Sequence, residues 1–126
     1  MYYVDSPTRG VDVFDYDAAS GSIGNRRLFA SIGGGEGVIP DGLAVDADGC
    51  VWVALWGGAA LVRYGHDGRP IQTIEIPAAH VTSCAFGGPD LATLYITTAG
   101  GPGRCAGALL ACQPGPTGLP ANPFRG

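Results

Sequence analysis

The fold is decided by the stretch Pro40-Asp41-Gly42-Leu43-Ala44-Val45-Asp46-Ala47-Asp48-Gly49-Cys50-Val51-Trp52-Val53-Ala54. Short apolar runs lie on both sides of the dipeptide Asp48-Gly49, as in two strands joined by a turn. Asp and Gly tolerate the positive φ that a two-residue turn demands. We therefore expect a hairpin whose strands are Gly42–Asp46 and Val51–Trp56.

The same pattern of short apolar runs and turn residues recurs along all 126 residues, which include 22 Gly and 10 Pro. No window of twelve residues free of Gly and Pro has apolar residues at helical spacing. The chain is therefore predicted to be all-β. Besides the central hairpin, the expected strands are Tyr2–Ser6, Val11–Tyr16, Arg27–Ser31, Leu61–Tyr64, Ile71–Ile76, Thr82–Phe86, Leu94–Thr98 and Ala108–Cys112.

The strands repeat with a period of about 40 to 50 residues and about four strands each, which is typical of β-propeller blades. Val53 corresponds to Ile96, and the run 1–5 resembles the run 51–55. By this count the chain holds about two and three-quarter blades of four-stranded antiparallel sheet. Three strands belong to residues 1 to about 35, four to about 41–77 and three to 81 to about 114. The first strand corresponds to the second strand of a blade.

Composition excludes several partners. The net charge is −4, and the seven Lys and Arg do not cluster beyond Arg26-Arg27, so we expect no nucleic-acid partner. No apolar run is long enough to span a membrane, and the first residues do not resemble a signal peptide. We expect a cytoplasmic protein without a membrane partner.

The four cysteines, Cys50, Cys84, Cys105 and Cys112, form no C-x-x-C pair that would indicate zinc or redox chemistry. Structural, reduced thiols are the preferred interpretation. Disulfides remain the alternative, because the count is even.

Five segments carry a resemblance to a known family: residues 2–7, 11–17, 40–54, 82–88 and 94–99. Together they resemble the second half of the SMP-30/gluconolactonase/regucalcin family. The resemblance implies a six-bladed β-propeller that hydrolyses sugar lactones with one divalent metal in its central channel. Residues 1–126 are then expected to be the C-terminal part of one such domain, truncated so that the N-terminal half is absent.

The resemblance also implies a metal site, whose ligands in the family are a Glu, an Asn and the Asp of a Pro-Asp-Gly motif. Only the last maps onto this chain, at Asp41, which is expected to be a metal ligand and a possible general base. The other two ligands fall upstream, so the chain alone is expected to be inactive. Ca²⁺ is the preferred ion, with Zn²⁺, Mg²⁺ or Mn²⁺ as alternatives.

The residues next to Asp41 also favour a role as a metal ligand, independently of the family resemblance. Pro40 fixes the backbone at the start of the strand, and Gly42 is expected to clear space beside the carboxylate for a ligand. An oxygen ligand on a rigid strand end suits Ca²⁺. The alternative, for an isolated Pro-Asp-Gly, is an Asp that caps a turn.

Other candidate sites are weaker. Asp46-Ala47-Asp48-Gly49 lacks two carboxylates that an EF-hand requires, and a turn is expected there. Residues 101–106 fit G-x-G-x-x-A, but no helix follows, so a loop is expected. His80, Ser83 and Asp90 could form a triad, although no nucleophile elbow surrounds Ser83. His80 precedes an inner strand at the blade position of Asp41, where it could line the channel.

The two tryptophans, Trp52 and Trp56, are expected to fill the space between blades, with sugar stacking as the alternative. His66 is expected to be a solvated turn residue.

Three functions stay open at this point. The first is a metal-dependent hydrolase acting on a small-molecule sugar lactone. The second is a non-enzymatic Ca²⁺-binding regulator or scaffold, because a propeller fold alone does not decide function. The third is a half-propeller that closes its ring by self-association or with a complementary N-terminal half, since its end faces need cover.

Overall fold

The computed structural model describes residues 1–122, in which ten strands and no helix are present. The all-β prediction is therefore confirmed. Within this part of the chain, no helix is long and apolar enough to cross a membrane. The strands are β1 (Tyr2–Asp5), β2 (Gly10–Tyr16), β3 (Ile23–Ser31), β4 (Ile39–Val45), β5 (Val51–Trp56), β6 (Ala60–Tyr64), β7 (Pro70–Glu75), β8 (Val81–Gly87), β9 (Thr93–Thr98) and β10 (Leu109–Cys112).

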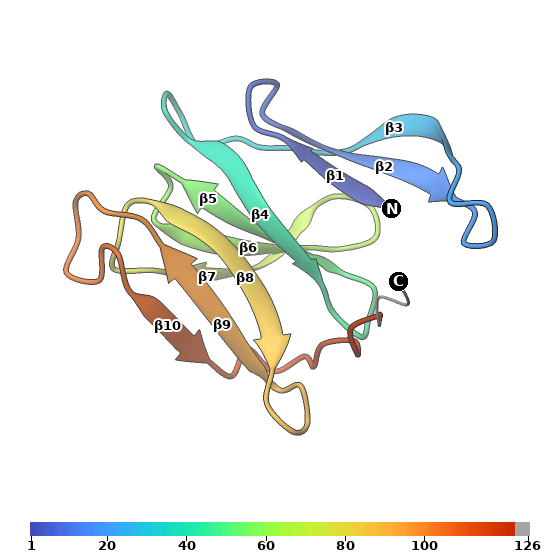
Figure 1. Ribbon diagram of the computed structural model, residues 1–126. Helices are drawn as coiled ribbons and strands as arrows, with labels where there is room; N and C mark the ends of the chain where they lie inside the picture. Colours follow the sequence, from blue (N-terminus) through green and yellow to red (C-terminus); the bar gives the residue numbers. More distant parts are fainter. Residues whose placement is uncertain (123–126) are drawn as a thin grey trace.

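The strands form three antiparallel sheets (Figure 1). The first contains β1-β2-β3, the middle one contains β4-β5-β6-β7, and the last contains β8-β9-β10. This is the predicted division into three, four and three strands. Strands β1 and β2 pair without a bulge, as β5 and β6 do, whereas β4–β5 and β8–β9 each contain a bulge. In this respect β1 resembles the second strand of a blade.

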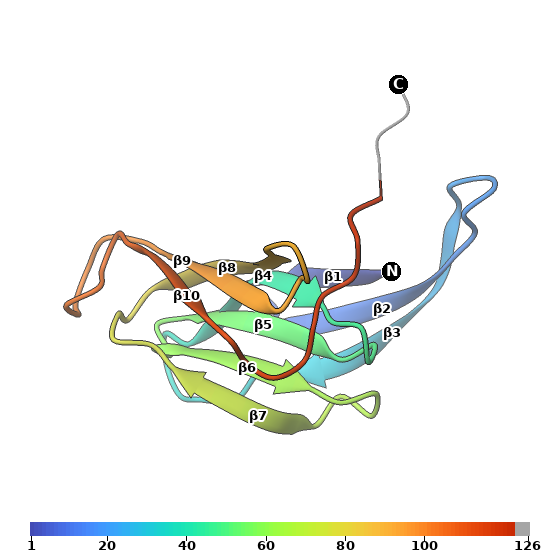
Figure 2. The ribbon, with the colours of Figure 1, turned by 90° about the horizontal axis from the view of Figure 1, so that it is seen from below.

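The three sheets are arranged so that the N-terminal strands of neighbouring sheets lie in contact. Strand β4 contacts β1 on one side and β8 on the other, and Figure 2 shows β8, β4 and β1 in succession along one side of the molecule. The sheets thus stack face to face, in the manner of neighbouring propeller blades.

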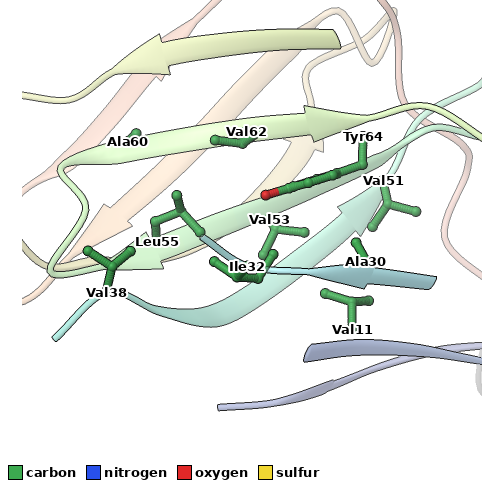
Figure 3. Packing of buried hydrophobic residues seen from close by; sticks show 10 residues of the cluster. All are labelled: Val11, Ala30, Ile32, Val38, Val51, Val53, Leu55, Ala60, Val62 and Tyr64. Carbon is green, nitrogen blue, oxygen red and sulfur yellow. The ribbon is translucent and has the colours of Figure 1, made fainter. Parts of the chain in front are cut away.

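Two hydrophobic clusters fill the spaces between the sheets. The first joins the first and middle sheets, and Figure 3 shows ten of its buried residues, among them Val11, Ala30, Val53 and Val62. The second cluster joins the middle and last sheets around Trp52, which is fully buried. Because each strand alternates its side chains between two faces, the middle sheet contributes to both clusters.

Three details of the prediction are wrong, and the first is that strand β4 begins at Ile39 rather than Gly42. Strand β3 begins at Ile23 rather than Arg27, because polar pairs such as Asn25–Asp15, with 3.0 Å between the side-chain atoms, extend its pairing with β2. The turns are also longer than two residues, since five residues separate β4 from β5 and β6 from β7. At these turns only Gly49 and Gly68 have positive φ. A type I turn followed by a left-handed glycine fits this pattern.

The first of these turns is anchored by Asp46, whose side chain is fully buried. Its carboxylate accepts hydrogen bonds from the backbone N–H groups of Asp48 (3.0 Å) and Cys50 (2.9 Å). It also accepts hydrogen bonds from Trp52 Nε1 (2.9 Å) and Arg63 Nε (2.7 Å). The prediction of turn residues, rather than a calcium loop, is therefore confirmed for residues 46–49, but the buried network was not predicted.

The segment after β10 turns back across the middle sheet. The side chain of Gln72 on β7 donates a hydrogen bond to the Pro114 carbonyl at 3.0 Å. Farther along, the backbone of Thr117 accepts one from Ala47, and Gly118 donates one to Leu91. The segment therefore ties the last sheet to the Asp46 turn.

Candidate functional site

Asp41 lies in a β-bulge near the start of innermost strand β4. Pro40 pairs with Leu55 and Leu43 pairs with Val53, so two residues of β4 lie opposite a single residue of β5. Pro40 is among the fully buried residues, and it fixes the backbone just before the bulge. Bulges change the direction of a side chain and often occur beside functional sites. The sequence therefore places a carboxylate at an irregular point of an otherwise regular strand.

The surroundings of Asp41 favour its neutral form. Burial raises the pKa of the Asp41 carboxyl above its ordinary value of 3.8. Burial is the sole cause of this shift, in contrast to Asp46, whose pKa several hydrogen bonds hold down. A partly desolvated carboxylate without such donors is suited to bind a cation or to accept a proton.

Two innermost strands also approach each other closely at this bulge. A Cβ atom at Gly42 would lie 2.6 Å from Ser83 Cβ and 2.8 Å from Ser83 Cα, on β8. Only glycine fits there without a shift of the backbone. We expected Gly42 to clear space for a ligand beside the carboxylate, but the neighbouring strand, at Ser83, lies where a side chain of residue 42 would stand.

His80 and Trp56 form a stacked pair near the same end of the sheets. Their ring centroids are 4.0 Å apart and the rings are inclined by 6°. Their backbones form an isolated bridge between the middle and last sheets, and Trp56 also pairs with Ile39, two residues before Asp41. His80 Nδ1 lies 2.8 Å from the Gly100 carbonyl oxygen. With the proton on Nδ1 this contact is a hydrogen bond, and Nε2 then keeps a lone pair.

His80 does not hold the blade position of Asp41, contrary to the prediction. Strand β8 has its own bulge, between the pairs Val81–Thr98 and Ser83–Thr97, and the extra residue is Thr82. Thr82 therefore takes the place of Asp41 in the last sheet. Its hydroxyl lies 2.8 Å from the hydroxyl of Thr97. Both inner strands carry the bulge at the same place, and the repeat that matches Leu43 with Cys84 already matches Asp41 with Thr82, two residues after His80.

The structure does not bring the remaining candidates together. His80 precedes β8, whereas Asp90 follows it and binds the backbone of Ala92. A seven-residue strand spans on the order of 20 Å, so His80, Ser83 and Asp90 form no triad. Residues 101–106 form turns, as expected.

The tryptophans and cysteines fit the preferred interpretations. Trp52 packs edge-on against Phe86 of the last sheet, with 6.3 Å between ring centroids, so it does fill the space between sheets. Trp56 is only half-buried, and its role there is the stack with His80. All four cysteines are free thiols.

A metal ion needs more ligands than this site offers. No group of three or more His, Cys, Asp or Glu side chains with metal-binding geometry occurs in residues 1–122. Asp41 fits as one hard oxygen ligand, but Ca²⁺ usually takes six to eight oxygens. The described residues also enclose no pocket. Within residues 1–122, Asp41 therefore has no cluster of such side-chain ligands around it.

Sequence reasoning overlooked two features of this region. The stack of Trp56 on His80 joins residues 24 positions apart, and only the pairing of strands from two sheets brings them together. The contact between Gly42 and Ser83 likewise depends on how the inner strands approach. The one available signal was that Trp56 is the last residue of one predicted strand and His80 lies just before another.

Comparison with known proteins agrees with this architecture. The chain is 43% identical over 100 residues to regucalcin of Xenopus laevis, covering 79% of this chain and 33% of that protein. It is 44% identical over 100 residues to a putative sugar lactone lactonase, YvrE, of Bacillus subtilis, covering 79% and 34%. The chain therefore spans about one third of the length of these relatives.

A solved structure shows the same fold. A calcium-binding protein, regucalcin, from Agrobacterium tumefaciens superposes with a TM-score of 0.82 at 30% identity, over 94% of this chain and 43% of that one. This likeness confirms the partial six-bladed β-propeller predicted from the sequence. The family described as SMP-30/Gluconolactonase/LRE-like region matches residues 1–100. The chain belongs to the SMP-30/gluconolactonase/LRE-like family.

Proposed function

We propose that this chain forms part of a hydrolase of sugar lactones, in which Asp41 is the catalytic carboxylate. The observation that carries the proposal is the placement of Asp41. It lies in a bulge of an innermost strand, and burial raises the pKa of its carboxyl. The similarity to a putative sugar lactone lactonase supplies the substrate class.

Lactone hydrolysis adds water to an ester carbonyl and breaks the ring C–O bond, which leaves a hydroxy acid. A carboxylate with a raised pKa can accept the proton of the attacking water and then return it to the departing ring oxygen. Asp41 suits this role because its pKa is raised without a competing hydrogen bond.

The ion of the proposed site is a divalent metal, with Ca²⁺ preferred over Zn²⁺, Mg²⁺ and Mn²⁺. Asp41 would be one of its ligands. Such an ion polarises a carbonyl group and stabilises the negative charge that develops on its oxygen. Because one copy of the described chain lacks the further ligands, we expect the isolated chain to bind Ca²⁺ weakly and to be inactive.

A hybrid protein tests this proposal. The 100 residues of this chain that align with the Bacillus subtilis protein replace their counterparts in that protein. We expect the hybrid to hydrolyse a sugar lactone and the chain alone not to do so. A folded hybrid without lactone hydrolysis, beside an active Bacillus protein, would overturn the proposal.

The second candidate function is a Ca²⁺-binding regulator without catalysis. The solved relative described as a calcium-binding protein favours it. Calorimetric titration of the hybrid with Ca²⁺, together with the lactone assay, separates the two functions. Ca²⁺ binding without turnover would favour the regulator.

A further inference from the structure

The bulge of strand β8 carries hydroxyl side chains to which the proposed chemistry assigns no role. Two residues of β8, Thr82 and Ser83, lie opposite Thr97 of β9. The bulge of β4 has the same form, and Asp41 is its first residue. Thr82 therefore stands in the last sheet where Asp41 stands in the middle sheet.

Hydroxyl groups occur within β8 only at this bulge. Just before it, Val81 is fully buried, and just after it, Cys84 is 6% exposed. Both pack between the middle and last sheets, whereas Thr82 and Ser83 are half-buried. Because a bulge changes the direction of a side chain and often lies beside an active site, two hydroxyls at this point suggest a role other than packing.

The bulges of β4 and β8 lie side by side. The two strands are the innermost strands of neighbouring sheets and contact each other. A Cβ atom at Gly42 would lie 2.8 Å from Ser83 Cα. Gly42 directly follows Asp41, and Ser83 directly follows Thr82. Thr82 therefore belongs to the same region of the molecule as the Asp41 carboxylate.

A second hydroxyl holds the hydroxyl of Thr82. Thr82 Oγ1 and Thr97 Oγ1 are 2.8 Å apart, and Thr97 Oγ1 also lies 3.5 Å from the Ser83 carbonyl oxygen. A hydroxyl group donates one hydrogen bond and accepts up to two. Whichever threonine donates to the other, the Thr82 hydroxyl keeps the capacity for a further hydrogen bond.

A sugar lactone offers the matching groups. Its ring carbons beside the carbonyl carry hydroxyls, each of which donates and accepts hydrogen bonds. When Asp41 acts at the carbonyl carbon, these hydroxyls point to the surroundings of the carboxylate, where the neighbouring inner strand lies. The threonine hydroxyl is neutral, so it pairs with a sugar hydroxyl without competing with Asp41 for a cation or a proton.

We propose that Thr82 is a specificity-determining residue, whose hydroxyl forms a hydrogen bond with a ring hydroxyl of the sugar lactone. Thr97 acts through Thr82 and is a positioning residue. The inference rests on the proposed function and adds which part of the substrate this strand recognises. A contact that is equally strong with the substrate and the transition state lowers KM and leaves kcat unchanged.

Steady-state kinetics of the hybrid protein with two substrates tests the inference. One substrate is a sugar δ-lactone, and the other is δ-valerolactone, which has the same ring without hydroxyls. Thr82→Val removes the hydroxyl and keeps the branched shape of the side chain. We expect KM for the sugar lactone to rise about tenfold at nearly constant kcat. Both constants for δ-valerolactone should stay unchanged.

Three further variants sharpen the test. Thr82→Ser keeps the hydroxyl and should hold KM for the sugar lactone within about threefold of the parent value. Thr97→Val should raise this KM by a smaller factor than Thr82→Val, and should have no further effect when added to it. Thr73→Val, at an exposed residue of outer strand β7, is the matched control and should change neither substrate.

Two kinetic results would overturn the inference. One is a Thr82→Val hybrid that loses activity on both lactones to the same extent, because a residue that serves only the fold or the carbonyl chemistry does not sense ring hydroxyls. The other is an unchanged KM for the sugar lactone.

A binding measurement separates this inference from the proposed function. In a sugar lactam an N–H group replaces the ring oxygen, and the amide resists hydrolysis, so calorimetry gives its dissociation constant without turnover. In a folded hybrid that does not hydrolyse lactones, about tenfold weaker lactam binding by Thr82→Val would support the role of Thr82 although the proposed function had failed. Equal binding by parent and variant, or a folded parent that does not bind the lactam, would overturn the inference.

Discussion

The indole Nε1 of Trp52 donates a hydrogen bond of 2.9 Å to the carboxylate of Asp46, and both side chains are fully buried. Trp52 forms the centre of the packing between the middle and last sheets, whereas Asp46 holds the turn between β4 and β5. The guanidinium group of Arg63 joins them, because its Nε contacts Asp46 at 2.7 Å and its centre lies 5.9 Å from the Trp52 ring centroid. One hydrogen bond thus links turn geometry to core packing.

Loss of the Asp46 carboxylate should destabilise the fold strongly. Asp46→Ala leaves the Trp52 N–H and the Arg63 guanidinium without their buried partner, and we expect a loss of about 3–5 kcal/mol in unfolding free energy. Asp48→Ala is the control, since Asp48 pairs with the same arginine but its side chain is 68% exposed. It should cost less than about 1 kcal/mol. Urea unfolding curves measure both, and equal losses would contradict this account.

The same carboxylate should make stability depend on acid pH. Burial alone would raise the Asp46 pKa, but hydrogen bonds from Arg63, Cys50 and Trp52 outweigh it and hold the pKa below 3.8. A folded-state pKa lower than the unfolded value stabilises the protein above the unfolded value, and this stabilisation is lost as pH falls toward the folded value. Unfolding free energy should therefore drop below about pH 4. In Asp46→Asn the unfolding free energy should depend less on pH in this acid range. An unchanged slope of unfolding free energy against pH would contradict the assignment.

Asp41 should have the opposite effect on stability. Burial raises the pKa of its carboxyl, so ionisation of this group opposes folding as pH rises above 3.8. Asp41→Asn should therefore raise the melting temperature of the chain at neutral pH and leave it nearly unchanged near pH 3, where both forms are neutral. Thermal unfolding at the two pH values measures this. A lower melting temperature at neutral pH would show that the carboxylate serves the fold instead of a site.

The close approach of β4 and β8 should not tolerate a side chain at Gly42. In Gly42→Ala the added Cβ meets Ser83 Cα at 2.8 Å, and the two inner strands must move apart. We expect a loss of about 1–3 kcal/mol. Gly24→Ala on β3 is the matched control, because no heavy atom lies within 4 Å of its added Cβ. Adding Ser83→Gly to the Gly42→Ala variant should recover part of the lost unfolding free energy, which denaturant unfolding curves measure.

Cys84 should be unreactive while the protein is folded. Burial raises the pKa of its thiol from 9.0 to about 12. At mildly alkaline pH the thiolate fraction then falls by about a thousandfold relative to a free cysteine. Iodoacetamide labelling followed by mass spectrometry should modify Cys84 in urea but not in native buffer. Rapid native labelling would show that the space between the sheets is open.

Most of the fold follows from local sequence signals. Apolar runs and turn dipeptides such as Asp67-Gly68 identify all ten strands, since each strand must bury one or both faces and most of the connections contain a residue with positive φ. The start of β3 was not predicted because Gly24, Asn25 and Arg26 interrupt the apolar pattern after Ile23. There the pairing depends on Asn25 and Arg27 reaching Asp15 on the facing strand, which a single-strand pattern does not encode.

Less of the candidate site could be predicted from the sequence. The Pro-Asp-Gly motif identified Asp41, whose metal-binding and catalytic roles stay predictions. The bulge that holds it, and the matching bulge at Thr82, depend on strand pairing and were not predicted. The buried role of Asp46 was also missed, because a turn aspartate and a network aspartate look alike in sequence until Arg63 and Trp52 are placed beside it.

The most direct test of the proposed function is the catalytic efficiency of the hybrid protein on a sugar lactone with and without the Asp41 carboxylate. Asp41→Asn should lower kcat/KM by roughly 10²- to 10⁴-fold, because it removes the proposed proton acceptor and metal ligand together. Glu36→Gln, an equal loss of charge at an exposed residue just before β4, should leave kcat/KM unchanged. An Asp41→Asn hybrid as active as its parent would contradict the assignment of this carboxylate to the site.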